Sequence, residues 1–141
     1  MIKNFTQGRH ALLPGLCCSL LLLSACATVV PVEKTIEERA MTRWNTVLSG
    51  DFTGAYEFLS PGYRSSVSST QYQRQLLLSK VKWTGASYLG SECTESACKV
   101  KISLDFTLYG GIPGIKSFDG KDIIEESWVQ SDKQWYLVPK Q

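Results

Sequence analysis

The sequence predicts an α+β fold, in which N-terminal helices pack on one face of an antiparallel sheet of about four strands. Apolar residues recur at helical spacing between about residues 35 and 80, and apolar and polar residues alternate with a period of two from residue 82 onward. The 141 residues are 43% hydrophobic and 20% charged, which suits one folded domain and excludes a mostly disordered chain.

Three helices are expected before the strands. The first begins at Thr35, which forms a capping-box pattern with Glu38, and it ends at Gly50. Asp51 can cap a second helix over residues 52–59, and a third is expected near residues 70–80. The first helix has an apolar stripe and places most of its charged residues elsewhere on the helical wheel: Ile36, Ala40, Trp44, Val47 and Leu48 against Glu37, Arg39 and Arg43.

Four strands are expected after the helices. Residues 82–90 and 99–109 form the first two, and residues 122–130 and 134–139 form the last two around a turn at 131–133. Residues 110–120 contain four glycines and are expected to form a loop. The strand over 99–109 alternates most clearly, with one face made of Val100, Ile102, Leu104, Phe106 and Leu108.

Residues 1–25 have the composition of a secretory signal peptide, because Lys3 and Arg9 precede an apolar stretch that ends at Leu23. The sequence Leu23-Ser24-Ala25-Cys26 is similar to the lipobox of bacterial lipoproteins. This resemblance implies cleavage before Cys26 and attachment there of lipid, with acyl chains such as palmitate. Residues 26–32 are then the lipidated cysteine and its tether, and residues 33–141 the domain. An uncleaved transmembrane anchor over residues 11–30 is the alternative.

Either reading places the domain outside the cytoplasm and anchors it to a lipid bilayer. The residue after Cys26 is Ala27 rather than the aspartate typical of retention in the inner membrane of enteric bacteria. The resemblance therefore implies the periplasmic face of the outer membrane in a Gram-negative source.

The two cysteines that remain in the domain are predicted to form a disulfide. Cys17 and Cys18 leave with the signal peptide and Cys26 carries lipid, so Cys93 and Cys98 are left in an oxidising compartment. They lie between two predicted strands and can join them across the turn. A redox-active pair is the alternative, although such pairs favour the shorter Cys-X-X-Cys spacing.

Several packing motifs of the domain are similar to those of nuclear-transport-factor-2-like proteins, also described as cystatin-like or SnoaL-like. The similar segments are Arg39-Ala40, Arg43-Trp44, Leu48-Ser49-Gly50-Asp51, Ala55-Tyr56, Leu59-Ser60-Pro61 and the final strand Lys133-Gln134-Trp135-Tyr136-Leu137-Val138. The resemblance implies a curved sheet that wraps a long helix into a cone. The family often has a short strand between its second and third helices, for which Tyr63–Val67 is the candidate.

The residue types of the domain exclude several kinds of catalytic site. The one histidine, His10, lies in the signal peptide, which removes histidine-based nucleophilic catalysis from the domain. Neither a metal site nor a cofactor is expected, and no phosphate-binding loop is present. Glu125 and Glu126 are neighbours on a strand, so they point to opposite faces and cannot act as a pair. Asp105 is the best candidate for a catalytic base, with a solvated strand aspartate as the alternative.

Two groups of residues are candidates for binding. The first could line a cone-shaped pocket, although such residues also form ordinary cores: Trp44, Tyr56, Tyr63, Tyr72, Tyr88, Asp105 and Trp128. The second places Ile112, Ile115 and Phe118 in the glycine-rich loop, where exposed apolar side chains can contact a partner or cover a pocket. The alternative is that these side chains fold down on the domain.

We therefore expect a non-catalytic binding or assembly module in the cell envelope, which contacts another protein or forms a homodimer through the sheet. The alternatives are a small-ligand binder that uses the cone and an isomerase or lyase with Asp105 as base. The net charge of +2 comes from Lys3 and Arg9, because removal of residues 1–25 leaves 13 basic and 13 acidic residues. A neutral domain without a basic stripe disfavours nucleic acid as a partner.

Overall fold

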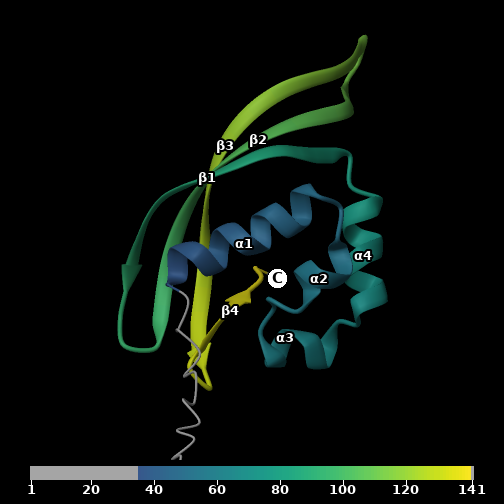
Figure 1. Cartoon of the computed structure of the whole chain (residues 1–141). Helices are drawn as coiled ribbons and strands as arrows, with labels where there is room; N and C mark the ends of the chain where they lie inside the picture. Colours follow the sequence, from purple (N-terminus) through teal and green to yellow (C-terminus); the bar gives the residue numbers. More distant parts are fainter. Residues whose placement is uncertain (1–34, 141) are drawn as a thin grey trace, which may run out of the picture. The chain divides into compact units, whose positions relative to one another are not determined.

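A computed structural model describes residues 35–140, which belong to the compact unit Val32–Gln141 (Figure 1). Helices come first and strands follow. The helices are α1 (Ile36–Leu48), α2 (Phe52–Tyr56), α3 (Pro61–Ser66) and α4 (Ser69–Leu77), and the strands are β1 (Val81–Cys93), β2 (Ala97–Ile112), β3 (Ile115–Ser131) and β4 (Gln134–Val138). This order confirms the predicted α+β class.

The four strands form one antiparallel sheet in the order β1-β2-β3-β4, so each strand pairs with its neighbour in sequence. The strands bend, and the helices lie on one side of the sheet with α1 against it (Figure 1). The side chains of Val100, Ile102 and Leu104 point towards the helices and are fully buried, as the alternation of β2 predicts.

The ends of the helices follow from local capping. Thr35 and Glu38 form the predicted capping box at the start of α1, and Ser68 and Gln71 form another at the start of α4. The second helix ends at Tyr56 rather than residue 59, because the chain beyond it bonds to β4. The N–H of Ser60 donates to the carbonyl of Leu137 at 2.8 Å, and the N–H of Leu137 donates to the carbonyl of Phe58 at 2.8 Å.

The prediction of a short strand at Tyr63–Val67 was wrong, because these residues belong to α3 and its C-terminal end. Ser60 caps this helix through its side chain, which accepts from the N–H of Tyr63, and Pro61 occupies the first turn. Both features favour a helix, since proline has the φ angle of a first helical turn and serine satisfies a free N–H there.

The prediction of a loop over residues 110–120 was also wrong. β2 and β3 continue as a hairpin to Ile112 and Ile115, and only Pro113 and Gly114 form the turn. Gly110 and Gly114 have φ angles of 64° and 82°, which explains two of the glycines by the backbone at and near the turn. Gly120 is explained by side-chain packing instead. A Cβ there would lie 2.6 Å from the ring of Phe106, so only glycine leaves room for that ring.

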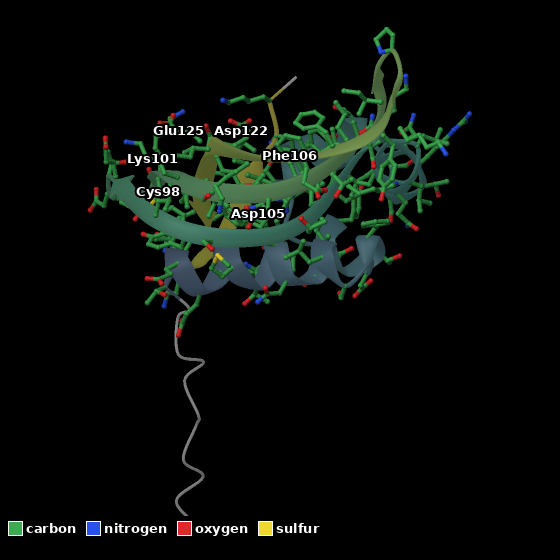
Figure 2. All side chains as sticks on the ribbon, turned by 90° about the horizontal axis from the view of Figure 1, so that it is seen from above. Cys98, Lys101, Asp105, Phe106, Asp122 and Glu125 are labelled. Atoms are coloured by element: carbon green, nitrogen blue, oxygen red, sulfur yellow. A yellow bond between two sulfur atoms is a disulfide. The ribbon has the colours of Figure 1, made fainter. Side chains whose placement is uncertain are left out.

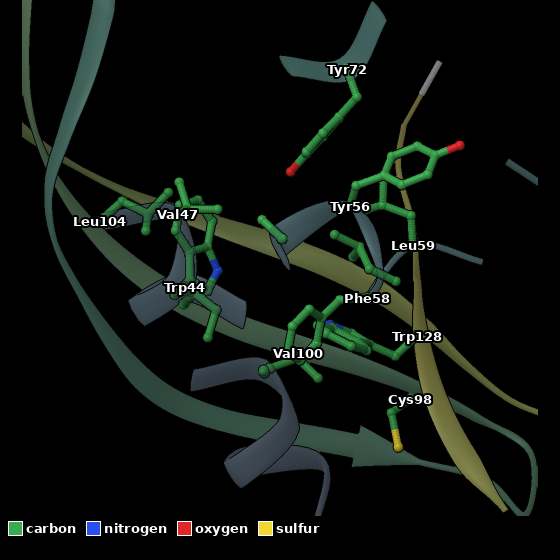
Figure 3. Close-up of a cluster of buried hydrophobic side chains, with 14 residues drawn as sticks. Trp44, Val47, Tyr56, Phe58, Leu59, Tyr72, Cys98, Val100, Leu104 and Trp128 are labelled. Atoms are coloured by element: carbon green, nitrogen blue, oxygen red, sulfur yellow. The ribbon is translucent and has the colours of Figure 1, made fainter. Parts of the chain in front are cut away.

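The core lies between the helices and the sheet (Figure 3). Its largest fully buried side chains are Trp128, Leu59, Ile102, Leu104 and Val100. β4 contributes Leu137, which is almost fully buried. Burial of these apolar groups, drawn from helices and strands alike, is the main term that holds the two layers together.

Candidate functional site

The hairpin formed by β2 and β3 exposes several apolar side chains near its turn. We call residues 108–118 the hairpin end. Three of its large side chains are strongly exposed, with relative accessibilities of 51% for Tyr109, 47% for Ile115 and 40% for Phe118. Ile112, which was predicted to contribute to the same surface, has a side chain that lies outside the described part of the structure. Ile115 and Phe118 are thus accessible, as the partner-loop prediction requires, but they lie on a strand.

A series of aromatic contacts joins the hairpin end to the core. Trp44 of α1 meets Trp83 edge to face at a centroid distance of 5.8 Å, and Trp83 meets Phe106 at 6.0 Å. Phe106 in turn meets Phe118 edge to face at 6.0 Å. Edge-to-face contacts of this kind stabilise aromatic pairs beyond their buried area. The hairpin end is therefore held by side-chain packing, and Phe118 is the point at which the series reaches solvent.

The end of α4 adds further apolar surface near the same end of the sheet. Leu77 and Leu78 are more exposed than the hairpin residues, at 60% and 71%. The N–H of Tyr109 donates to the carbonyl of Lys80 at 3.0 Å, so the segment that follows α4 runs beside the hairpin. Tyr109 and Phe118 belong to adjacent pairs of the register and so point to opposite faces of the hairpin, which exposes apolar side chains on both faces at this end of the domain. Exposed apolar side chains of this kind can contact a protein partner.

The residues predicted to line a cone-shaped pocket mostly pack in the core. Trp44, Tyr56, Tyr72 and Trp128 are buried among other apolar side chains, and Tyr63 and Tyr88 are half-buried against them. Apart from the Tyr63 hydroxyl, their polar side-chain groups have partners within the domain. The hydroxyl of Tyr56 donates to the carbonyl of Val67 at 2.7 Å, and the hydroxyl of Tyr88 bonds to that of Ser91 at 2.8 Å.

Tyr63 lines a surface hollow of about 610 Å³ between α3, α4 and the C-terminal segment. Its other walls include Ser60, Gln75 and Lys140. Burial raises the pKa of the Tyr63 phenol, and the neighbouring Tyr72 and Tyr56 raise it further. The hydroxyl of Tyr63 therefore stays protonated and is available as a hydrogen-bond donor.

Asp105 is half-exposed on the sheet, where its side chain is 47% accessible and lies 2.8 Å from the ammonium group of Lys121. Its strand neighbours in the register are Gly85 and Lys121. This is the environment of a solvated strand aspartate paired with a lysine on the neighbouring strand.

Glu126 is the polar residue that sequence reasoning missed. Its carboxylate is buried and accepts hydrogen bonds from the guanidinium of Arg43 at 3.0 Å and from the indole N–H groups of Trp44 and Trp128, each at 3.1 Å. Burial raises the pKa of Glu126, and the charge of Arg43 and the two indole hydrogen bonds oppose that shift. The prediction that Glu125 and Glu126 face opposite sides is confirmed, since Glu125 is exposed and lies 3.6 Å from Lys99.

The prediction that Arg43 lies on the polar face of the first helix was wrong. It was placed with the charged residues away from the apolar stripe, yet it is buried beside Trp44, with its guanidinium carbon 4.4 Å from the indole centroid. The signal that could have found this site is the alternation Ile124-Glu126-Trp128, which places a carboxylate on an apolar strand face. A buried carboxylate requires a cation, and Arg43 lies between Ala40 and Val47 on the buried side of α1.

The predicted disulfide is confirmed by geometry. Cys93 and Cys98 are bonded, with Cα atoms 4.1 Å apart, and they are directly opposite each other in the register of β1 and β2. Among the described residues, no group of three or more cysteine, histidine or acidic side chains is placed to hold a metal ion.

The predictions for the N-terminus lie outside the described residues 35–140. These are the signal peptide over 1–25, lipidation of Cys26, the tether over 26–32 and the alternative anchor over 11–30. Within the described part of the chain, none of the helices has the length and apolar character needed to span a membrane.

Comparison with known proteins gives two informative structural matches. No protein-family model matches the sequence, and no curated protein sequence matches it either. A SEC-C motif containing protein from Rhodopseudomonas palustris matches with a TM-score of 0.59 and 16% identity, over 74% of this chain and 76% of that chain. A SEC-C motif containing protein from Psychrobacter arcticus matches with a TM-score of 0.54 and 13% identity, over 76% of this chain and 60% of that chain.

These matches share the fold of this chain, and they overturn the resemblance drawn from its sequence. The structural neighbours are SEC-C motif containing proteins, so the assignment to nuclear-transport-factor-2-like proteins was wrong. Nothing in either match indicates a lipoprotein. The motifs that suggested the family are a Gly-Asp helix end, an Ala-Tyr pair and an aromatic final strand. Such patterns serve local packing and recur in unrelated proteins that pack helices on a sheet.

Proposed function

We propose that this chain is a non-catalytic binding module of the cell envelope, which is anchored to a lipid bilayer through acyl chains on Cys26 and contacts a partner protein through the hairpin end. The observation that carries the proposal is the exposure of Tyr109, Ile115 and Phe118 on a hairpin that aromatic packing holds in place. Apolar groups on a rigid support lose little conformational freedom when they bind, which favours affinity.

The anchor supports the proposal from the sequence. Leu23-Ser24-Ala25-Cys26 has the residue types and the position of a lipidation site after an apolar stretch. Several acyl chains on one residue provide stable anchoring, since each buried CH₂ contributes about 0.8 kcal/mol. A domain held in this way meets partners in the plane of the membrane, and the proposed membrane is the outer one, at its periplasmic face.

A partner protein suits the hairpin end better than a small ligand does. Ile115 and Phe118 are exposed near the end of a hairpin, whereas small ligands are usually enclosed in concave sites. The cone-shaped ligand pocket and the use of Asp105 as a catalytic base stay predictions.

The test is purification of the full chain from membranes in mild detergent, followed by native mass spectrometry. We expect a co-purifying protein with the wild type, together with an added acyl mass on Cys26. I115D should lose the co-purifying protein while keeping the wild-type unfolding temperature, because it adds a charge to an exposed apolar contact. F118D should lose the protein too, but at a lower unfolding temperature, because it also removes the ring contact with Phe106.

Leu89→Asp is the matched control. Leu89 is a strongly exposed apolar residue of β1, 53% accessible, and lies outside the hairpin end. L89D should keep the partner. Retention of the partner by F118D, or its loss from L89D as well, would contradict a binding surface at the hairpin end.

A further inference from the structure

One edge of β3 is free over most of its length. β2 pairs with β3 from Ile115 to Val129, whereas β4 pairs only with Ser127 to Ser131. In the described sheet β3 is therefore the outermost strand over residues 115–126, and Figure 1 shows its upper half with β2 on one side only. The backbone N–H and C=O groups that point away from β2 can pair with another strand.

The outer face of the sheet is less suited to docking than this edge. It carries cross-strand ion pairs, and Figure 2 shows Lys101 and Glu125 on the side away from the helices. A partner on this face would have to remove water from charges that are already paired. The free-energy cost of removing that water is rarely exceeded by the attraction between the charges. The interactions are Lys121–Asp105 at 2.8 Å, Lys101–Glu92 at 3.4 Å, Lys99–Glu125 at 3.6 Å and a Thr107–Asp119 hydrogen bond at 2.6 Å.

We propose that the free edge of β3 pairs with the same edge of a second copy of this chain, antiparallel and about a twofold axis at Gly120. The two four-stranded sheets then join into one continuous sheet. Gly120 is one of the two central residues of 115–126, so pairing about it uses residues 115–125, all but one position of the free length. A twofold axis makes the interface self-complementary, which is the usual arrangement of a homodimer.

The charges beside Gly120 suit this register. Residues at equal distances from the axis oppose each other, so Asp119 of each copy faces Lys121 of the other, and the opposite-charge pair occurs twice. Their partners within the chain, Thr107 and Asp105, lie on β2, so the contact across the axis is an additional one on the other side of β3. A shift of the axis to Lys121 places two lysines opposite each other, and a shift to Asp119 places two aspartates opposite each other. The neighbouring symmetric registers are therefore disfavoured, and the charges specify a single one.

The edge is protected in the single chain by a local hydrogen bond. The N–H of Ile123 donates to the carboxylate of Asp122 at 2.8 Å, which satisfies one of the outward-pointing groups. In the proposed dimer Ile123 opposes Ser117 of the second copy, and its N–H exchanges the side-chain acceptor for a carbonyl. The dimer adds a self-association surface to the proposed binding module and does not require the partner protein.

The test is charge reversal in the full chain, with the dimer dissociation constant measured by sedimentation velocity in mild detergent. D119K alone and K121D alone each place like charges opposite each other twice, so each should raise the dissociation constant at least about tenfold. An equimolar mixture of D119K and K121D chains restores opposite charges at both positions, and it should form a heterodimer with about the wild-type constant. A monomeric wild type, or a mixture that stays monomeric, would overturn the proposal.

Glu95→Lys is the matched control, because it reverses a charge in the exposed turn between β1 and β2 and should leave the dissociation constant unchanged. Ile123→Pro gives a second variant that does not depend on charge. It removes an N–H that already has a side-chain partner, so the single chain should keep its far-ultraviolet circular dichroism while the dimer is lost. A dimer that survives I123P contradicts pairing at this edge. A monomeric wild type that still binds a partner protein would contradict the proposed dimer but not the proposed function.

Discussion

At the scale of single residues, the buried pair of Arg43 and Glu126 shows how one charge in an apolar strand shapes the core. Glu126 receives three hydrogen bonds, from one guanidinium and two indoles, which compensate for its removal from water. Arg43 is less well satisfied, because its Nε atom is buried without a hydrogen-bond partner in the described structure. We therefore expect the pair to add little net stability, although burying either charge without the other is costly.

This imbalance predicts a strongly non-additive response to substitution. E126L should lower the free energy of unfolding by about 3–5 kcal/mol, because it leaves the buried guanidinium without its anion. R43M should lower the free energy of unfolding by a similar amount, because it leaves the buried carboxylate of Glu126 without its cation. The double variant R43M/E126L should recover most of the loss, since apolar groups of similar size remove both buried charges together.

Urea denaturation of the wild type, both single variants and the double variant measures this coupling. E125L is a suitable control, because Glu125 is exposed and its ion pair with Lys99 at 3.6 Å should contribute less than about 1 kcal/mol. Additive losses in R43M and E126L would show that the two side chains do not act as a pair.

At the scale of elements, the β2–β3 hairpin shows how tertiary contacts override a local signal. Four glycines within residues 110–120 favour a loop, and glycine does lower strand stability. The strand persists because Leu108 pairs with Phe118 and the ring of Phe106 covers Gly120. Phe118 was expected on a loop and lies on this strand, half-exposed and in contact with Phe106.

The opposite end of β2 carries the disulfide, whose stabilisation can be predicted from its short loop. The bond joins residues with a sequence separation of 5, and loop-entropy reasoning gives a contribution of about 2 kcal/mol. In urea denaturation, the free energy of unfolding of the double variant C93S/C98A should be lower than that of the wild type by this amount. The variant should keep the circular dichroism spectrum of the folded protein. Alanine suits position 98, because Cys98 is buried and a hydroxyl there would lack a partner.

Reduction of the wild-type disulfide by a thiol should produce the same loss as the double variant. An unfolding free energy that does not change on reduction would show that the turn is closed without the bond. In that case the backbone hydrogen bond from Thr94 to Ala97 at 2.8 Å would hold the β1–β2 connection alone.

At the scale of the whole molecule, β4 joins the helical layer to the sheet. It pairs with β3 on one side and with the segment after α2 on the other, through a parallel bridge between Leu59 and Leu137. The side chain of Arg39 adds a hydrogen bond from α1 to the carbonyl of Trp135 at 3.1 Å. Because one strand contacts α1, the α2 end and β3, we expect the two layers to unfold together.

Leu137→Ala tests this cooperativity. Leu137 is 5% exposed, so removing its side chain leaves a cavity and should cost about 2–5 kcal/mol. Helical circular dichroism and tryptophan fluorescence should then change in one shared transition at a lower urea concentration. V138A is the control. Val138 is 37% exposed on the same strand, so its truncation should lower the free energy of unfolding much less. Separate transitions for the two signals would show that the layers are independent.

The sequence by itself determined the order of helices and strands, the capping box at Thr35, the buried face of β2 and the disulfide partners. Each of these depends on residues close together in the chain, or, for the cysteines, on a small number of candidates. Only the tertiary structure decided that Arg43 is buried with Glu126, that Gly120 belongs to a strand, and that the edge of β3 stays free. These features depend on contacts between residues far apart in sequence, such as Arg43 and Glu126 at a sequence separation of 83. Local periodicity does not reveal such contacts.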